Sequence, residues 1–323
     1  MSRLHSKFLF LASSLCLVIA PIAAVAQTTM SGPEQSAIMA ADSLTLPLDS
    51  LNIAARSDLA PSSDELTWHD AVTNLPSDWA TAGKVVVRPE NLPIVLGVGA
   101  LTGVLVLVDH QAFNASDRLY RKSPFVRDVS DFTVHLGDGA VHAGVAVAFG
   151  LYGLVGNDHR ALRTASQTLE ALVVTGITVQ VLKRIAGKES PELATSDRGM
   201  WRLFPSPAKY QKNQPKYYAF PSGHIATTMA TVTTIAANYP EATWIRPVGY
   251  VIVAGVGFSL VNVRYHWYSD LPLGIAIGYM FGKIVARGTD GRLSENDQPG
   301  RCRFVLHPDL QRDGGGVTLA MVF

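Results

Sequence analysis

The sequence predicts an all-α protein: a six-helix bundle followed by a short C-terminal β-hairpin. Hydrophobic residues make up 48% of the 323 residues and charged residues only 16%, so the chain can bury a large core. Apolar segments rich in Gly and Ala recur with similar lengths of about 15 to 19 residues, which is typical of a helical bundle. The net charge of +1 gives no sign of a nucleic-acid-binding protein, and we expect none as a partner.

The first 26 residues have the pattern of a secretory signal peptide. Two basic residues precede a mostly apolar run at 8–23, and Ala-Val-Ala at 24–26 provides a cleavage site. We therefore expect a mature chain that starts at Gln27 and an exported protein of a bacterial-type cell envelope, in the periplasm or the membrane. An uncleaved membrane anchor is the alternative.

Three further regions follow in order. Residues 27–91 are polar and interrupted by Ser, Asp and Pro, which predicts an extended or partly ordered exported segment. Residues 92–287 form the predicted helical domain. Its expected helices are Pro93–Val108, Ala140–Gly156, Thr164–Leu182, Ile225–Tyr239, Pro247–Val263 and Leu271–Ala286.

Glycines mark the last helix and the C-terminal region. Gly274, Gly278 and Gly282 stand four residues apart, a spacing that lets a neighbouring backbone approach closely. Within 288–323 a polar linker precedes two short apolar runs on either side of a Gly-rich turn, which predicts a β-hairpin.

The tetrapeptide Pro221-Ser222-Gly223-His224 suggests a phosphate pocket. Ser222 and Gly223 offer a hydroxyl and unhindered backbone N–H groups, and a helix is expected to begin at His224 or Ile225. The N-terminus of a helix points its free N–H groups at an anion. This arrangement suits the oxygens of a phosphate group.

A second pair of residues suggests nucleophilic chemistry. His266 and Asp270 stand four apart, so the carboxylate can reach the imidazole, fix its tautomer and support its charge when the histidine acts as a nucleophile. His224 is then placed to protonate the leaving oxygen. Asp109, His110 and Asp138 are too scattered to indicate a metal site, so we predict no catalytic metal and no cofactor.

These residues resemble the type 2 phosphatidic acid phosphatase superfamily, which includes bacterial acid phosphatases and vanadium haloperoxidases. Its signature is Lys, six residues, Arg-Pro; then Pro-Ser-Gly-His; then Ser-Arg, five residues, His, three residues, Asp. Lys183, Pro221–His224, His266 and Asp270 match it, and the resemblance covers roughly residues 92–287. It implies a helical bundle of the acid phosphatase/haloperoxidase type and phosphate contacts from Lys183.

Two positions depart from the signature. Ser190 and Leu260 stand where the family has arginines that clamp phosphate oxygens, and the loss of a bidentate guanidinium is not conservative. Lys188 and Arg264 are the local substitutes. The predicted phosphate-binding residues are Lys183, Ser222, Gly223, Arg264 and Lys188.

If successive helices alternate in direction, the topology independently tests whether the three motifs lie close together. Alternating directions place the end of the third helix, the start of the fourth, the end of the fifth and the start of the sixth at one end of the bundle, so the three motifs converge. The apolar runs lie at the short edge of what spans a bilayer. The sequence leaves open whether they cross a membrane or form a soluble bundle.

The combined pattern predicts a metal-independent phosphatase that works through a phosphohistidine at His266. Its expected partners are a phosphorylated lipid, a polyprenyl diphosphate or a small phosphate ester, together with membrane association. Two alternatives remain open. One is a catalytically weak or inactive envelope protein that binds phosphate or lipid head groups. The other, less favoured because the arginines are missing, is a vanadium haloperoxidase.

Overall fold

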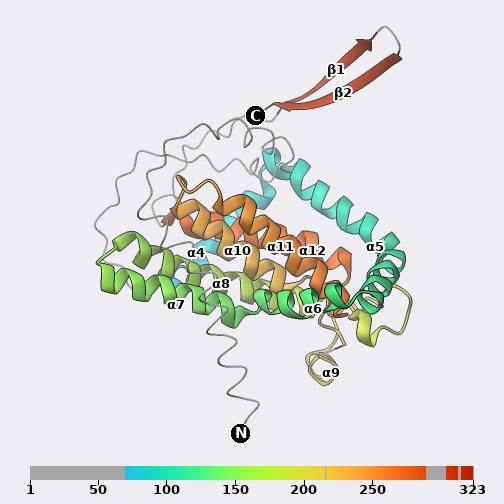
Figure 1. Ribbon diagram of the computed structural model, residues 1–323, viewed down its shortest axis with the longest axis horizontal. Coiled ribbons are helices and arrows are strands. Elements are labelled where there is room, and N and C mark those ends of the chain that lie inside the picture. The colour runs from blue at the N-terminus through green and yellow to red at the C-terminus, as the bar shows by residue number, and fades with distance from the viewer. Residues whose placement is uncertain (1–69, 215, 289–302, 312–313, 323) are drawn as a thin grey trace. The chain divides into compact units, whose positions relative to one another are not determined.

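Helices dominate the part of the chain that the computed structural model describes, which is residues 70–214, 216–288, 303–311 and 314–322 (Figure 1). All of these residues lie in one compact unit, residues 50–323. The six predicted helices are confirmed as α5 (Leu92–Lys122), α7 (Gly139–Gly156), α8 (His159–Ala186), α10 (Gly223–Asn238), α11 (Ile245–Asn262) and α12 (Leu271–Ala286).

Shorter elements precede and connect the six helices. A 3₁₀ turn, η6, precedes α12 and carries the Asp of the third motif. The elements before the first of them are α3 (Asp70–Thr73), α4 (Leu75–Val87) and η3 (Pro89–Asn91). The connecting elements are α6 (Pro124–Thr133), η4 (Val134–Gly137), η5 (Pro191–Leu193), α9 (Pro207–Lys212) and η6 (Tyr268–Asp270).

Local signals explain where α8 begins and ends. The carboxylate of Asp158 accepts hydrogen bonds from the backbone N–H groups of Arg160 and Ala161, which caps the N-terminus. At the other end Gly187 adopts a left-handed conformation with φ of 51°, and its N–H bonds the carbonyl of Lys183. A side chain at Gly187 would collide with the backbone of Arg202 at 2.4 Å, so this turn needs glycine.

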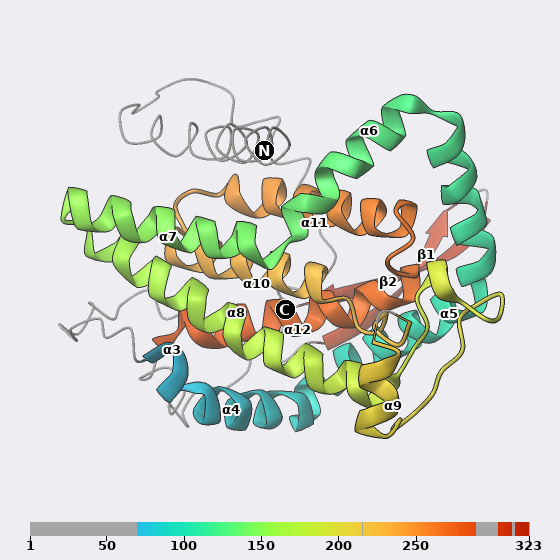
Figure 2. The ribbon, with the colours of Figure 1, turned by 90° about the horizontal axis from the view of Figure 1, so that it is seen from below.

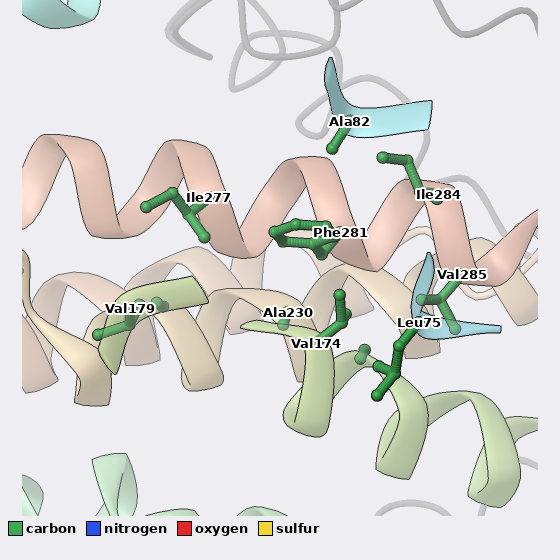
Figure 3. Close-up of a cluster of buried hydrophobic side chains, with 11 residues drawn as sticks. Leu75, Ala82, Val174, Val179, Ala230, Ile277, Phe281, Ile284 and Val285 are labelled. Atoms are coloured by element: carbon green, nitrogen blue, oxygen red, sulfur yellow. The ribbon is translucent and has the colours of Figure 1, made fainter. Parts of the chain in front are cut away.

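The centre of the bundle is formed by α8, α10 and α12, which lie side by side (Figure 2). Buried apolar side chains from these helices and from α4 form one cluster (Figure 3), whose members include Leu75, Ala82, Val174, Val179, Ala230, Ile277, Phe281, Ile284 and Val285. Burial of such a cluster is the main term that stabilises the bundle.

The predicted close approach at the three glycines of α12 is confirmed. A methyl group added at Gly274, Gly278 or Gly282 would lie 2.7, 2.2 or 2.8 Å from a backbone oxygen of the chain segment at 222–230. The nearest of these oxygens to η6 belongs to Ser222. The glycines therefore let α10 and α12 pack closely over several turns, and Gly274 lies against Ser222, where two of the motifs meet.

The expectation of an extended or partly ordered segment up to residue 91 did not include α3, α4 and η3, which lie in its described part. Leu75, Ala82 and Val85 are buried, and their spacing of seven and three places them on one face of a helix. This stripe packs against α8 and α12. The predicted signal peptide, the start at Gln27 and residues 27–69 lie outside the described residues.

Three described helical segments are long and apolar enough to cross a membrane, judged by length and composition: Pro89–Lys122, Gly139–Gly156 and Ile245–Asn262. In Pro89–Lys122, only 6% of the most apolar stretch of 18 residues is buried. Leu96, Val155 and Val251 are 69%, 90% and 72% exposed, so each segment presents large apolar side chains outward. Such faces suit contact with lipid and favour membrane association.

The predicted C-terminal hairpin appears as β1 (Arg303–Gln311) paired antiparallel with β2 (Gly314–Val322). Phe304 pairs with Met321 and Leu306 with Leu319.

Candidate active site

The Pro-Ser-Gly-His motif forms the start of α10. The backbone N–H of Ser222 bonds the carbonyl of Asp270 at 3.0 Å, which ties the second motif to the third. Gly223 is the first residue of α10, so the free N–H groups of the first turn lie there. The hydroxyl of Ser222 is fully buried and has no hydrogen-bond partner in the described residues. A phosphate oxygen would satisfy it.

His266 and Asp270 form the pair that their spacing predicts. Nδ1 of His266 lies 3.4 Å from Oδ2 of Asp270, and the same oxygen accepts the backbone N–H of Trp267 at 2.8 Å. Since Nδ1 faces the carboxylate, Nε2 is the nitrogen left for chemistry. Burial lowers the pKa of His266 despite the nearby carboxylate, which favours the neutral imidazole.

A carboxylate also supports the second histidine. Nε2 of His224 lies 3.2 Å from Oδ1 of Asp138, the residue that precedes α7. The rings of His224 and His266 are 6.2 Å apart between centroids and nearly perpendicular. Burial, followed by the proximity of His266, lowers the pKa of His224 to about 4 although Asp138 opposes the shift. A bound phosphate anion would raise this pKa and favour the protonated form.

Lys183 lies at the end of α8, as the topology predicts. Its side chain is buried, its Nζ donates to the carbonyl of Tyr218 at 2.7 Å, and it lies 3.4 Å from the centroid of the Tyr218 ring. Lys183 also interacts electrostatically with His266 and His224. The structure therefore brings Lys183, Ser222, Gly223, His224, His266 and Asp270 together at one end of the bundle.

The two proposed substitutes for arginine are held by carboxylates. Lys188 is fully buried, and its Nζ lies 2.7 Å from Oδ1 of Asp270 and 3.3 Å from Oδ2 of Asp109. Arg264 donates from Nε and Nη2 to Oδ1 of Asp117 on α5, at 3.1 and 2.6 Å. Its side chain is 40% exposed. As phosphate ligands, both stay predictions.

The two positions where the family has arginines, 190 and 260, are buried in this structure. Leu260 is completely buried in an apolar cluster with Ile225, Met229 and Val256. Ser190 is also buried, and its N–H bonds the carbonyl of Lys216.

The basic loop between α8 and α10 is organised by a buried acid. Glu189 accepts hydrogen bonds from the N–H groups of Thr195 and Met200 and pairs with Arg202 and Lys216 at 3.5 and 3.3 Å. Burial alone would raise the pKa of Glu189, but these donors lower it to about 2. Two of the basic residues in the loop thus fix its shape.

A family model described as the PAP2 superfamily matches residues 165–293. The match contains every candidate site residue from Lys183 to Asp270, including all three motifs. This part of the chain, which carries the three motifs, is similar to the PAP2 superfamily.

Similar proteins were found in two further comparisons. A lipid A 1-phosphatase of Porphyromonas gingivalis is 33% identical over 67 residues, which are 20% of this chain and 15% of that relative's length. The crystal structure of Aquifex aeolicus LpxE matches with a TM-score of 0.41 and 18% identity over 55% of this chain and 93% of that chain. The crystal structure of a transmembrane PAP2 type phosphatidylglycerolphosphate phosphatase from Bacillus subtilis matches with a TM-score of 0.38 and 15% identity, over 71% and 99%.

Two residues at this site precede the PAP2 match, and sequence reasoning missed their roles. Asp138 pairs with His224, and Asp109 pairs with Lys188. Both were considered only as scattered metal ligands. The available signal was their position. Asp138 lies two residues before the predicted helix Ala140–Gly156, and Asp109 directly follows the apolar run Pro93–Val108, where a carboxylate needs a partner.

Proposed function

We propose that this protein is a membrane-associated phosphatase that hydrolyses a phosphate ester, with His266 as the nucleophile and no metal ion. The observation that carries the proposal is the facing pair of histidines, each next to its own carboxylate. The similarity to a lipid A 1-phosphatase and the exposed apolar helices support a lipid phosphate as the substrate.

In the first proposed step, Nε2 of His266 attacks phosphorus and the bond from phosphorus to the leaving oxygen breaks. Asp270 orients the ring and balances the charge that develops on it. His224, protonated once the phosphate anion is bound, gives its proton to the leaving oxygen. Lys183, the Ser222 hydroxyl and the N–H groups at the start of α10 stabilise the charge on the phosphate oxygens.

In the second proposed step, water hydrolyses the phosphohistidine. His224 is now neutral, and it takes a proton from the water as the water oxygen attacks phosphorus. The phosphorus–nitrogen bond breaks, inorganic phosphate leaves, and neutral His266 is restored. The cycle uses only groups from this chain and one water molecule.

The experiment is phosphate release by the full chain in detergent with EDTA, tested on lipid phosphates, a polyprenyl diphosphate and small soluble esters. The parent should release phosphate from at least one lipid phosphate, and His266→Ala should abolish release. His159→Ala, at the exposed start of α8, is the matched control and should behave like the parent. Binding of phosphate lipids without turnover would favour the head-group-binding alternative, for which the carboxylate-bound Lys188 and Arg264 are the supporting observation.

A further inference from the structure

A cluster of buried charges lies behind the predicted catalytic pair. It consists of Asp109 on α5, Lys188 in the loop after α8, and Ser269 and Asp270 on η6. We call it the buried charge cluster. Nζ of Lys188 donates to Oδ1 of Asp270 at 2.7 Å and to Oγ of Ser269 at 2.6 Å, and pairs with Asp109 at 3.3 Å. All four side chains are fully buried.

The cluster determines how Asp270 is oriented. One carboxylate oxygen, Oδ1, is bound to Lys188, whereas the other, Oδ2, accepts from Trp267 N–H and faces His266. Rotation of the carboxylate would break the contact with Lys188 inside the protein, where an unpaired charge is costly. Lys188 therefore holds Oδ2 towards the imidazole.

Asp109 anchors this arrangement from a separate helix. Its Oδ1 accepts the backbone N–H of Ser269 at 3.1 Å, and its Oδ2 contacts the Ser269 hydroxyl as well as Lys188. Asp109 is about 80 residues from Lys188 in sequence, and α5 lies outside the PAP2 match. The contact joins α5 to η6, so Asp109 and Lys188 together fix the position of η6.

The charges in the cluster do not balance by themselves. Two carboxylates and one ammonium leave one negative charge. Buried charges favour compensation by a nearby opposite charge. The imidazole of His266 lies next to Asp270, and it becomes a cation when it is protonated or phosphorylated on Nε2. A cationic His266 would bring the group to zero.

We propose that Lys188 and Asp109 are positioning residues: Lys188 fixes the carboxylate of Asp270, and Asp109 supplies the negative charge that balances a cationic His266. The catalytic part of this inference rests on the proposed function. It assigns Lys188 a place behind Asp270 rather than on the substrate. Loss of the family arginine at position 190 then leaves the nucleophile intact and affects only the phosphate side of the pocket.

The proposal predicts opposite electrostatic effects from two variants. Asp109→Asn keeps the shape and removes a negative charge, so the pKa of His266 should fall by about half a unit or more. Lys188→Met removes a positive charge, so the pKa of His266 should rise by a similar amount. Thr175→Val removes a buried hydroxyl outside the cluster without changing charge, and it should leave the pKa of His266 within about 0.2 units of the parent.

Other charged or titratable groups also act on His266, and they are the same in all variants. They are Asp270 on η6, Lys183 on α8, and His224 on α10 with its partner Asp138.

The test is a direct titration of His266 by NMR in the full chain, in detergent, with ring-labelled histidine. The His266 signal is assigned by its loss in His266→Gln. Opposite shifts in Asp109→Asn and Lys188→Met, with Thr175→Val unchanged, are the expected result. Equal titration of His266 in the parent and both charge variants overturns the proposal. If Lys188→Met does not fold, Asp109→Asn against Thr175→Val decides alone.

Turnover provides a separate readout. Asp109→Asn should lower kcat for a phosphate ester about ten-fold and change KM less than about three-fold, because the charge is needed on the phosphohistidine and not for substrate binding. If the two charge variants show the predicted titration shifts but the parent hydrolyses nothing, the proposed function is contradicted and the positioning roles stay in place. Normal hydrolysis without titration shifts would do the reverse.

Discussion

Replacement of Ser222 by alanine should change stability and activity in opposite directions. The Ser222 hydroxyl is fully buried without a hydrogen-bond partner in the described residues, and such a group costs about 1 to 3 kcal/mol in the folded state. Its removal should raise the free energy of unfolding of the phosphate-free protein by about 1 kcal/mol. The backbone N–H that bonds Asp270 is unaffected.

The same hydroxyl should be valuable once phosphate is bound. A hydrogen bond to a charged oxygen contributes about 1.5 to 3 kcal/mol, so Ser222→Ala should lower kcat/KM by about ten-fold to a hundred-fold. Added phosphate should raise the unfolding temperature of the parent more than that of the variant, because the stabilisation by a ligand increases with its affinity. Thermal unfolding in detergent and phosphate release measure the two effects.

Thr175→Val is the matched control for this prediction. Thr175 on α8 is also fully buried, its hydroxyl has no partner in the described part of the chain, and valine has nearly the same shape. This variant should gain stability without a change in kcat/KM. The reasoning would be refuted by a Ser222→Ala protein that unfolds at a lower temperature and keeps the kcat/KM of the parent.

Three other substitutions test the surroundings of the site. Leu260→Arg places a guanidinium in an apolar cluster, so we expect the free energy of unfolding to fall by roughly 3 to 5 kcal/mol. Phosphate release should not increase. An increase would show that position 260 faces the phosphate. Asp138→Asn weakens the ion pair with His224. We expect kcat to fall about ten-fold for esters with poor leaving groups but less than about three-fold for esters with good ones. An equal loss of kcat for both classes of ester would argue against an acid role of His224. Arg264→Ala breaks a partly exposed pair with Asp117, and kcat/KM should stay within about three-fold; a loss of ten-fold or more at unchanged stability would restore Arg264 as a phosphate ligand.

The arrangement of the motifs could be predicted because it depends on features that a sequence displays directly. Apolar runs of helical length located the six helices, and alternation of their directions brought Lys183, His224 and His266 to one end. The glycines at 274, 278 and 282 indicated a tight contact, and that contact holds Ser222 next to Asp270.

The partners of the charged residues could not be predicted in the same way. Whether Lys188 points at the phosphate or behind Asp270 depends on the left-handed turn at Gly187, which redirects the chain after α8. Its second partner, Asp109, comes from a helix far away in sequence. Helix α4 was missed because its stripe of three apolar residues lies in an otherwise polar region and becomes informative only against α8 and α12.

The most direct test of the proposed chemistry is to trap the phosphoenzyme. The full chain is mixed in EDTA with a lipid phosphate labelled on phosphorus, quenched under alkaline conditions that preserve phosphohistidine, and digested for peptide mass spectrometry. We expect the label on His266 of the parent, none in His266→Ala, and more in His224→Ala with a good leaving group, because hydrolysis of the intermediate needs His224. Label on another residue, or sustained turnover by His266→Ala in a folded chain, would contradict the proposed mechanism.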